Sequence, residues 1–431
     1  MWRSRNQQLE LIGILIVGLL LVGAGAYMGM PTGNRAVTHQ GKMYINSQSY
    51  VEHENIFTQS DAELLALAED EGWEGTGTVE DPIIISGYSF YAEPTQPVRI
   101  WNTDLHWVFA NNLVRTSGVM CGFYLTQTTA GIIRENVFQG CHSAIAMINC
   151  GNIIIENNTF LSNIGNGVDQ EAALTNATIR YNEFWNHGAD AISLEDTNSV
   201  DIYGNYINGA QYDGIDTQNG HDILIEDNII LGTRMGIRIG RRSTDIHVVD
   251  NLVRNITHHG INCNGDSNLI ENNVLRDIGI NGIIFSGSEG LNAEENVVTS
   301  NTFINCTSYA IQIEEVVINT VITSNDFFET GQECHICDSS NDATIESNFY
   351  DTWTSPDVNG DSIVDNPYEI AGSIGNMDAS PKASPINQLP TDYEYTPIVT
   401  VQDELPLFEL ALISGIGITV CLIVVIMIKR R

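Results

Sequence analysis

A repeated pattern of apolar and polar positions runs through the middle of the chain. Short stretches in which such positions alternate, for example residues 223–226 and 246–249, are each followed by an asparagine. Alternation of this kind is typical of β-strands, whose successive side chains point to opposite faces. The asparagines recur every 22 to 28 residues and are Asn112, Asn136, Asn158, Asn182, Asn205, Asn228, Asn251, Asn273, Asn301, Asn325 and Asn348. A period of this length indicates a solenoid of stacked repeats.

A second mark follows each asparagine by about eight to ten residues, a small residue and then an apolar one, as in Gly214-Ile215 and Gly236-Ile237. One coil cannot bury its own apolar face, but stacked coils share a continuous core. The sequence therefore predicts an all-β fold, a right-handed parallel β-helix solenoid of 10 to 11 coils. We expect the asparagines at the corners, because Asn tolerates a left-handed backbone, and we expect them to form a hydrogen-bonded ladder.

Proline positions support the same fold. No proline lies between residues 98 and 355, the span that carries the repeat. A laddered solenoid has no room for a residue without a backbone N–H. The alternation and the many β-branched residues exclude helical repeats. The Leu-x-x-Leu-x-Leu signature of leucine-rich repeats and the hexapeptide rhythm of left-handed β-helices are both absent.

The ends of the solenoid are predicted to be capped. Ser60 and Glu63 form a capping box that opens a short helix, and Gly72 ends it. This helix belongs to an N-terminal region and cap over residues 31–97, and the β-helix occupies residues 98–348.

Two segments follow the β-helix in this division of the chain. Residues 349–380 are predicted to close the C-terminal end of the solenoid. Residues 381–407 contain several prolines and are predicted to be an extended tether.

Two apolar segments, free of charge over residues 11–30 and 410–428, are predicted to anchor the chain in a membrane. They are residues 11–30 and residues 408–428, and both are about long enough to cross a bilayer. Basic residues flank them in the terminal segments 1–10 and 429–431, which favours the cytoplasmic side for both tips. We therefore expect a protein of the cell membrane with an extracellular ectodomain and both termini cytoplasmic.

The N-terminal apolar segment has an alternative interpretation. Ala24-Gly25-Ala26 resembles a signal-peptidase site, so this segment is either an uncleaved anchor or a cleaved signal. The body of the chain lies outside the cell in both cases.

The charge balance excludes one class of partner. The chain has 54 acidic and 18 basic residues, a net charge of −36. A surface this negative repels phosphate backbones, so we expect no nucleic-acid partner.

Cysteine usage points to free thiols. Of the eight cysteines, Cys421 lies in the C-terminal apolar segment, and the remaining odd number cannot all pair internally. Cys334 and Cys337 have a spacing that places them on opposite faces of a strand. Buried thiols inside the coils are the expectation.

The repeat resembles the pectin-lyase-like superfamily of right-handed β-helices and, within it, the NosD-like or carbohydrate-binding and sugar hydrolysis repeat proteins. The resemblance is carried by the asparagine coils and by residues 75–85 and 348–368, and it covers roughly residues 73 to 380. It implies the fold, which hosts lyases, hydrolases, epimerases and binding proteins. Acidic, membrane-tethered versions are similar to archaeal cell-surface proteins. NosD assists copper-site maturation, but no Met/His/Cys cluster with copper-ligand spacing is present here, so that role is not carried over.

One stretch resembles the surroundings of the first catalytic Asp of polygalacturonases. It runs from Asp213 to Thr217 and includes Asp216, and the His258-His259 pair resembles their Gly-His-Gly. The paired Asp-Asp and the closing Arg-x-Lys of those enzymes are absent. Because every coil has a Gly-Ile step, chance also explains such a partial match. The catalytic candidates are Asp213, Asp216, Arg238 and His259.

Opposite charges and histidines converge on the same coils. Further candidates for substrate binding are Asp190, Arg234, Arg241, Arg242 and His258. The offset from the corner asparagines places Asp190 and Asp213 at one rung position, with His259 in line. The patch is either a site that holds an acidic sugar through Arg side chains or an Arg–Asp network that ties coils together. The corresponding functions are a surface protein that binds polysaccharide or acts structurally in the envelope, and a polysaccharide lyase or hydrolase of acidic glycans.

Two surface features complete the predictions. The oxygen spacing after residue 356 resembles the start of a calcium loop, with structural Ca²⁺ as the expected cofactor. Its candidate ligands are Asp357, Asn359, Asp361, the carbonyl of Ile363, and Asp365. The alternative is an acidic turn without metal. Glycosylation acceptors are predicted at Asn157, Asn176, Asn255 and Asn305, each of which begins an Asn-x-Ser/Thr triplet.

Overall fold

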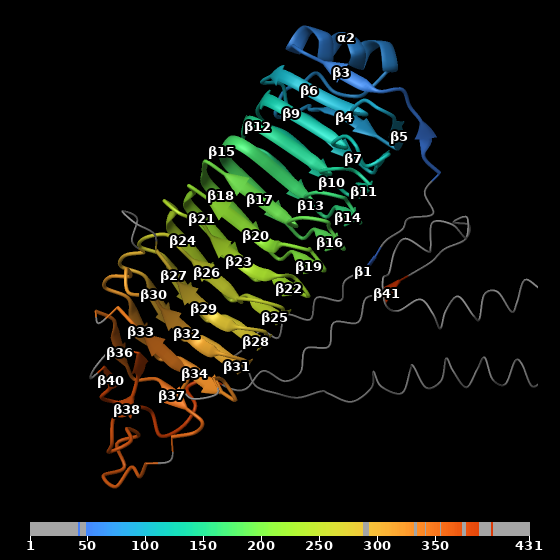
Figure 1. Cartoon of the computed structure of the whole chain (residues 1–431). Coiled ribbons are helices and arrows are strands. Elements are labelled where there is room, and N and C mark those ends of the chain that lie inside the picture. The colour runs from blue at the N-terminus through green and yellow to red at the C-terminus, as the bar shows by residue number, and fades with distance from the viewer. Residues whose placement is uncertain are drawn as a thin grey trace, which may run out of the picture. The chain divides into compact units, whose positions relative to one another are not determined.

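The computed structural model describes residues 42–43, 49–287, 293–331, 334–340, 342–353, 355–372, 376–387 and 398–399. Within them the chain winds into a parallel β-helix with three faces (Figure 1). This confirms the predicted all-β solenoid. The predicted membrane segments, residues 11–30 and 408–428, and the terminal tips lie outside the described residues. Among the described helices, none is long and apolar enough to span a membrane.

Face one is a separate 13-stranded sheet. Its strands are β2 (Val51–Glu52), β5 (Tyr88–Ala92), β8 (Leu113–Thr116), β11 (Val137–Gln139), β14 (Thr159–Leu161), β16 (Glu183–Trp185), β19 (Tyr206–Asn208), β22 (Ile229–Leu231), β25 (Leu252–Ile256), β28 (Val274–Ile278), β31 (Thr302–Cys306), β34 (Asp326–Phe328) and β37 (Phe349–Tyr350).

Faces two and three are joined in a 24-stranded sheet, because β15 (Val168–Arg180) continues from one face to the other. The other strands of face two are β3 (Ile56–Thr58), β6 (Val98–Thr103), β9 (Phe123–Thr128), β12 (Ile145–Gly151), β17 (Ile192–Glu195), β20 (Asp213–Gln218), β23 (Met235–Ile239), β26 (Ile261–Cys263), β29 (Asn281–Phe285), β32 (Tyr309–Ile313), β35 (Ile336–Asp338) and β39 (Ala371–Gly372). Those of face three are β4 (Ile83–Ser86), β7 (Trp107–Ala110), β10 (Gly131–Arg134), β13 (Ile154–Glu156), β18 (Thr197–Tyr203), β21 (His221–Glu226), β24 (Thr244–Val249), β27 (Leu269–Glu271), β30 (Val297–Thr299), β33 (Val321–Thr323) and β36 (Thr344–Glu346).

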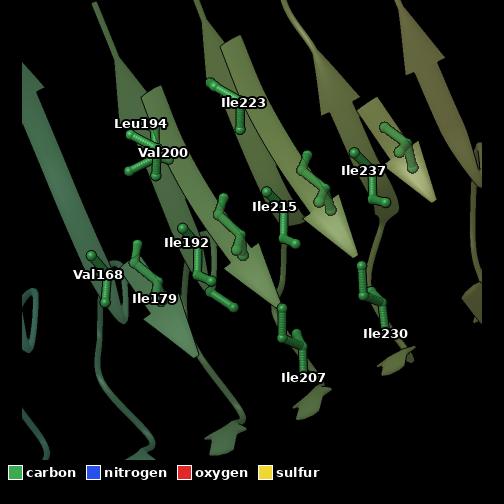
Figure 2. Packing of buried hydrophobic residues seen from close by; sticks show 14 of the residues in the cluster. Val168, Ile179, Ile192, Leu194, Val200, Ile207, Ile215, Ile223, Ile230 and Ile237 are labelled. Atoms are coloured by element: carbon green, nitrogen blue, oxygen red, sulfur yellow. The ribbon is translucent and has the colours of Figure 1, made fainter. Parts of the chain in front are cut away.

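Equivalent apolar side chains stack inside the coils. Ile192 pairs in register with Ile215, and Ile215 pairs with Ile237 on the next coil. All three are fully buried, and Figure 2 shows them with Ile207 and Ile230 of face one in the interior. The small residue before each of these apolar positions is required by the close stacking. A Cβ on Gly236 would lie 2.4 Å from the carbonyl oxygen of the next coil.

The predicted asparagine ladder is present along one corner. Each asparagine side chain accepts the backbone N–H of its equivalent on the preceding coil, from Asn112 Oδ1, which accepts from Tyr88 N, to Asn348 Oδ1, which accepts from Asn325 N. In the middle of the stack, Asn228 Nδ2 donates to Asn251 Oδ1 at 3.0 Å and to the Ile202 carbonyl at 2.8 Å. The ladder therefore satisfies backbone and side-chain groups that the corner buries.

The expectation that these asparagines adopt the left-handed backbone is wrong. The residue immediately before each ladder asparagine has the positive φ, as Glu135 and Tyr181 do with φ of 57° and 56°. The asparagine stands at the corner because of its amide side chain, which points inward. The left-handed position before it accepts Asn, Asp, Ser, Glu, Tyr or Gly.

Caps close both ends of the solenoid. The helix α2 (Asp61–Glu71) begins after Ser60, whose side chain accepts the Glu63 N–H, and ends at Gly72 with φ of 71°, as predicted. At the other end, β38 (Tyr368–Glu369) pairs antiparallel with β40 (Met377–Asp378). Asp378 Oδ2 there accepts the N–H of Asn348 at 3.0 Å, so a carboxylate ends the ladder.

The segment after this cap begins against the β-helix. Lys382 N donates to the Asn348 carbonyl, and the N–H groups of Ile386 and Asn387 donate to Asp326. The first residues of the predicted tether, 381–387, therefore contact the β-helix. Most of the tether beyond residue 387 lies outside the described residues. The short strands β1 (Lys42–Met43) and β41 (Ile398–Val399) pair with each other.

Candidate functional site

The charged patch predicted from the sequence lies on face two, on β20, β23 and the turns before β17 and β26. Its column of equivalent positions follows from the stacked isoleucines, since each member lies two residues before one of them. In coil order the column is Asp190, Asp213, Met235 and His259. The predicted alignment is therefore present, with Met235 between the carboxylates and the histidine. Asp213 N donates to Asp190 Oδ1 at 2.7 Å, so the two acidic residues are in direct contact.

Two arginines of one coil bind carboxylates of the preceding coil. Arg234 Nη2 lies 3.2 Å from Asp213 Oδ1, and Arg238 Nη1 lies 3.4 Å from Asp216 Oδ2 and 3.8 Å from Asp213 Oδ2. The Asp213 and Asp216 side chains are only 2% and 5% exposed, whereas both arginines are about one-third exposed. The arrangement is the Arg–Asp network across coils that the sequence left as one of two alternatives.

Burial controls the charge of the acidic residues in this network. It raises the pKa of Asp190 to about 7, an effect that the neighbouring Asp213 and Asp216 charges increase and Arg238 partly offsets. Burial also raises the pKa of Asp213 and of Asp216, which the arginines counteract. Near neutral pH the site therefore contains a carboxyl that binds and releases a proton beside two carboxylates held by arginines.

Several groups in the network have hydrogen-bonding capacity left over. Asp216 Oδ1, Arg234 Nε and His259 Nδ1 are buried and have no hydrogen-bond partner within the described residues. Burial lowers the pKa of His259, as do the charges of His258 and Arg234, so its ring is neutral at physiological pH. A buried polar group without a partner lowers stability, which makes this part of the network unusual within the β-helix.

Two residues of the site were missed from the sequence. Arg234 lies over the ring of Tyr212 with 5.2 Å from Cζ to the ring centroid, and Tyr212 is 51% exposed. Gln218 Nε2 donates to Asp216 Oδ2 at 3.1 Å. The register offset of two from Asp216 identifies Gln218 as a neighbour on the same outer surface, and the position before Asp213 identifies Tyr212.

Other predicted site residues are separate from the network. Arg241 and Arg242 are exposed in the turn after β23, and Arg242 has a positive φ of 63°. His258 is exposed beside His259, with 6.5 Å between their ring centroids, and its Nδ1 lies 3.3 Å from Thr257 Oγ1. The structure therefore gathers Asp190, Asp213, Asp216, Arg234 and Arg238, with both histidines alongside.

The predicted calcium loop forms a compact acidic turn. Asp357 accepts the N–H groups of Gly360, Asp361 and Ser362, and Asp361 accepts the N–H of Ile363 at 2.9 Å. The Asp365 carboxylate accepts the N–H of Val358. Among the described residues, no group of three or more His, Cys, Asp or Glu side chains is placed to hold a metal ion. Calcium binding here therefore stays a prediction, and so does the alternative of an acidic turn.

The four predicted glycosylation acceptors share one environment. All are exposed and have a positive φ of 52° to 57°, so each has a left-handed backbone at an outer position. They are Asn157, Asn176, Asn255 and Asn305.

The cysteines are free thiols wherever the structure describes them, as predicted. Cys141, Cys150, Cys263 and Cys306 are buried. Burial raises the pKa of Cys141 and of Cys263 to about 12, so both stay protonated.

Face three carries a separate hollow of about 700 Å³. Its lining includes Asp201, Asp222, Asp245 and His247, without any Arg or Lys. It lies on strands β18, β21 and β24 and does not include the Arg–Asp network.

Comparisons with known proteins support the fold. Residues 74–257 and 208–377 match a family described as "Periplasmic copper-binding protein (NosD)". No curated protein matches the sequence. The catalytic domain of Agl-KA has 13% identity and a TM-score of 0.53 over 75% of this chain and 70% of its own. The A-module of mannuronan C-5 epimerase AlgE4 from Azotobacter vinelandii has 13% identity and a TM-score of 0.42, over 68% and 97% of the two chains. An exopolygalacturonase from Thermotoga maritima has 12% identity and a TM-score of 0.44, over 69% and 94%.

The description of the matched family names copper, and the described residues do not fit a copper site. The thiols of Cys141 and Cys263 are held protonated, and within the described ranges no group of three or more His, Cys, Asp or Glu side chains is placed to hold a metal ion. The carboxylates of the face-two network are occupied by arginines. No copper chemistry is derived for this chain.

Proposed function

Because the chain belongs to the NosD family, whose matched segments span its β-helix, we propose that it is a cell-surface protein that binds a polysaccharide on face two. The family description names the periplasm, which supports placement of the β-helix outside the cytoplasm. The resemblance to archaeal surface proteins stays a prediction, since the comparisons do not indicate a source for this chain.

The observation that carries this proposal is the fixed cluster of polar groups beside an exposed aromatic ring. Asp213 holds Arg234 in place over Tyr212, which is about half exposed. Sugars present apolar C–H faces and rings of hydroxyl groups, so a ring face next to charged donors and acceptors suits them.

The charge balance favours a neutral polysaccharide over an acidic one. Arg234 and Arg238 already pair with Asp213 and Asp216, so little positive charge is left to attract a uronate. The chain as a whole has a net charge of −36 and repels acidic polymers.

Binding is tested with purified full-length protein on immobilised neutral and acidic polysaccharides, with and without Ca²⁺. We expect retention on a neutral polysaccharide, and roughly tenfold weaker binding for Arg238→Ala and Tyr212→Ala. The matched control is Arg254→Ala, because Arg254 pairs with Asp277 at 3.2 Å on face one. Absence of retention on every polysaccharide, or an equal loss in the control, contradicts the proposal.

A hydrolase is the second candidate, and one observation favours it. Burial raises the pKa of Asp190 to about 7, and Asp190 contacts Asp213 directly. A protonated carboxyl beside ionised ones is the arrangement by which glycosidases protonate a leaving oxygen and activate water. New reducing ends released from a neutral polysaccharide by the native protein, but not by Asp190→Asn, would establish this activity. Binding without any product leaves the binding protein as the function.

We also propose that residues 11–30 and 408–428 hold the β-helix at the outer face of the membrane. Both segments are apolar and flanked by basic residues, and residues 11–30 and 410–428 carry no charge. Protease added to intact cells should degrade the β-helix and spare both basic tips if the N-terminal segment is uncleaved. Protection of the β-helix under these conditions contradicts the topology.

A further inference from the structure

A second group of aromatic and basic side chains lies on face two near its N-terminal end. Phe57, Arg99 and Tyr124 occupy equivalent outward positions on β3, β6 and β9. Trp101 lies two residues after Arg99 and therefore on the same side of β6. The Arg99 Cζ atom is 5.0 Å, 4.5 Å and 5.5 Å from the ring centroids of Phe57, Trp101 and Tyr124. Arg99 thus holds three rings together in one surface cluster, the aromatic platform.

The rings of the platform are partly exposed, whereas one nitrogen of its arginine is buried. Phe57 is 49% exposed, and Trp101 and Tyr124 are partly exposed. Arg99 Nε is buried without a hydrogen-bond partner within the described residues. The interior of the protein does not explain the cluster, because Val98 and Ile100 provide the buried side chains of the same strand.

A polar hollow of about 320 Å³ adjoins the platform. Trp101 Nε1 donates to Gln127 Oε1 at 3.3 Å, and Gln127 lines the hollow. Thr103 Oγ1 donates to Asp61 Oδ1 at 2.6 Å, which fixes another part of the wall. The lining residues are Ser60, Asp61, Ala62, Asn102, Thr103, Asp104 and Gln127. Amide, hydroxyl and carboxylate groups next to a stacking surface are what a sugar ring requires.

The platform and the Arg–Asp network are connected by a straight line of equivalent positions. From Tyr124 the line passes through Ala146, Asp169 and Ser193 to Asp216, and the next position is Arg238. Adjacent strands of a sheet are about 4.8 Å apart, so the four steps from Tyr124 to Asp216 span about 19 Å. The separation of about 4.8 Å between adjacent strands approximates the length of one pyranose unit in an extended chain. Figure 1 shows β9, β12, β15, β17 and β20 following one another on this face.

We propose that the aromatic platform is a second sugar-binding subsite, and that a linear neutral polysaccharide lies along face two with about one sugar unit per coil. The polymer contacts the rings of Trp101 and Tyr124 at one end and Tyr212, Arg234 and Arg238 at the other. This inference rests on the proposed binding function and adds the direction and the minimum length of the bound chain.

The test compares short and long oligosaccharides on the full-length protein. The probes are cello-, malto- and manno-oligosaccharides of about two and about eight units, with Kd measured by calorimetry. We expect at least one long series to bind the native protein roughly tenfold more tightly than its short members. Trp101→Ala and Tyr124→Ala should abolish this gain, so that long members bind these variants no more tightly than short members do. Tyr91→Ala is the matched control, because Tyr91 is 60% exposed at the same end of the solenoid but on face one.

The possible results separate the two proposals. If Trp101→Ala binds long chains as the native protein does while Arg238→Ala is weakened, the platform is no subsite and the proposed function stands. If no series binds the native protein, both proposals fail. If Trp101→Ala changes only self-association in light scattering, the platform is a contact between copies of the chain and the inference is overturned. Melting temperatures of all variants should stay within a few degrees of the native value.

Discussion

At the residue scale, burial sets the protonation state of groups inside the β-helix. His187 is 1% exposed and packs against Phe184 with 5.8 Å between ring centroids. Burial lowers the pKa of His187 to about 3 from its ordinary value of 6.5. Asp190, three residues later, has its pKa raised to about 7 by burial. Both groups favour their neutral forms because the interior replaces water with apolar side chains.

This difference predicts how acid affects stability. Between pH 6.5 and about 3, the unfolded chain binds a proton at His187 that the folded chain excludes, so lowering the pH favours unfolding. The contribution is at most about 1.4 kcal/mol of unfolding free energy per pH unit. We expect His187→Leu to reduce the pH dependence of the melting temperature in this window, measured by calorimetry. His247→Leu, at an exposed position of β24, should retain the native dependence. Identical profiles for His187→Leu and the native protein would refute the assignment.

The column of Asp190, Asp213 and His259 was predictable, because a fixed offset from the ladder asparagine fixes the rung position. Arg241 and Arg242 were grouped with them because they share a coil with Arg238, yet a turn after β23 directs them to solvent. Trp101 was missed, since the coil before Asn112 lacks the corner asparagine that numbers the positions. Which charged side chains of a coil lie close together depends on the positions of its turns. The spacing of residues in the sequence predicts turn positions less well than it predicts strands.

At the element scale, the corner ladder joins successive coils. Asn228 Oδ1 accepts the N–H of Asn205, and its Nδ2 donates to the Ile202 carbonyl and to Asn251. All of these groups are buried, so loss of the side chain leaves several of them without partners.

Asn228→Ala is therefore expected to lower the unfolding free energy by roughly 3–5 kcal/mol, the sum of a few unsatisfied buried groups. Denaturation in guanidinium checks this value. The control, Asn198→Ala, removes an exposed asparagine of β18 and should cost less than about 1 kcal/mol. A loss of similar size in both variants would show that the ladder does not stabilise the coils.

The ladder shows which part of the fold follows from sequence. Identical asparagines at a constant period predicted both the corner and its hydrogen bonds, because only one residue type serves that role. The left-handed residues before them were not predicted, since Glu135, Tyr181 and Ser300 have no chemistry in common. Backbone shape at those positions is imposed by the stack and not by residue type.

The acidic turn of residues 357–365 gives a prediction at the same scale. If its oxygens hold Ca²⁺ as the sequence predicts, Ca²⁺ should raise the melting temperature of the native protein by several degrees. Asp357→Ala removes the carboxylate that accepts the Gly360, Asp361 and Ser362 N–H groups and should abolish this increase. Glu369→Ala, outside the turn, is the control. An unchanged melting temperature with Ca²⁺ in the native protein would favour a metal-free turn.

At the scale of the whole β-helix, each coil contacts only its neighbours, so the ends determine where unfolding begins. Asp378 closes the ladder by accepting the Asn348 N–H at 3.0 Å and the Tyr350 hydroxyl at 3.2 Å. The ring of Tyr368 stacks on the ring of Tyr350, with 3.8 Å between the ring centroids.

Asp378→Ala should therefore loosen the C-terminal coils first. Hydrogen exchange followed by mass spectrometry is expected to show faster exchange in β34 and β37, with β12 and β15 unchanged. Ser380→Ala, which alters only an outer contact of the same cap, is the control. Uniform acceleration along all coils would mean that the solenoid unfolds as one cooperative unit.

The in-register pairing of the coils has a consequence for how such a molecule changes over generations. The positions on the line from Tyr124 to Asp216 pair one to one from coil to coil. Duplicating one repeat of about 23 residues between these two residues therefore lengthens the line by about 4.8 Å. Neither end of that line is altered by the insertion. The distance between two sites on the outer surface can therefore change only in steps of one whole coil.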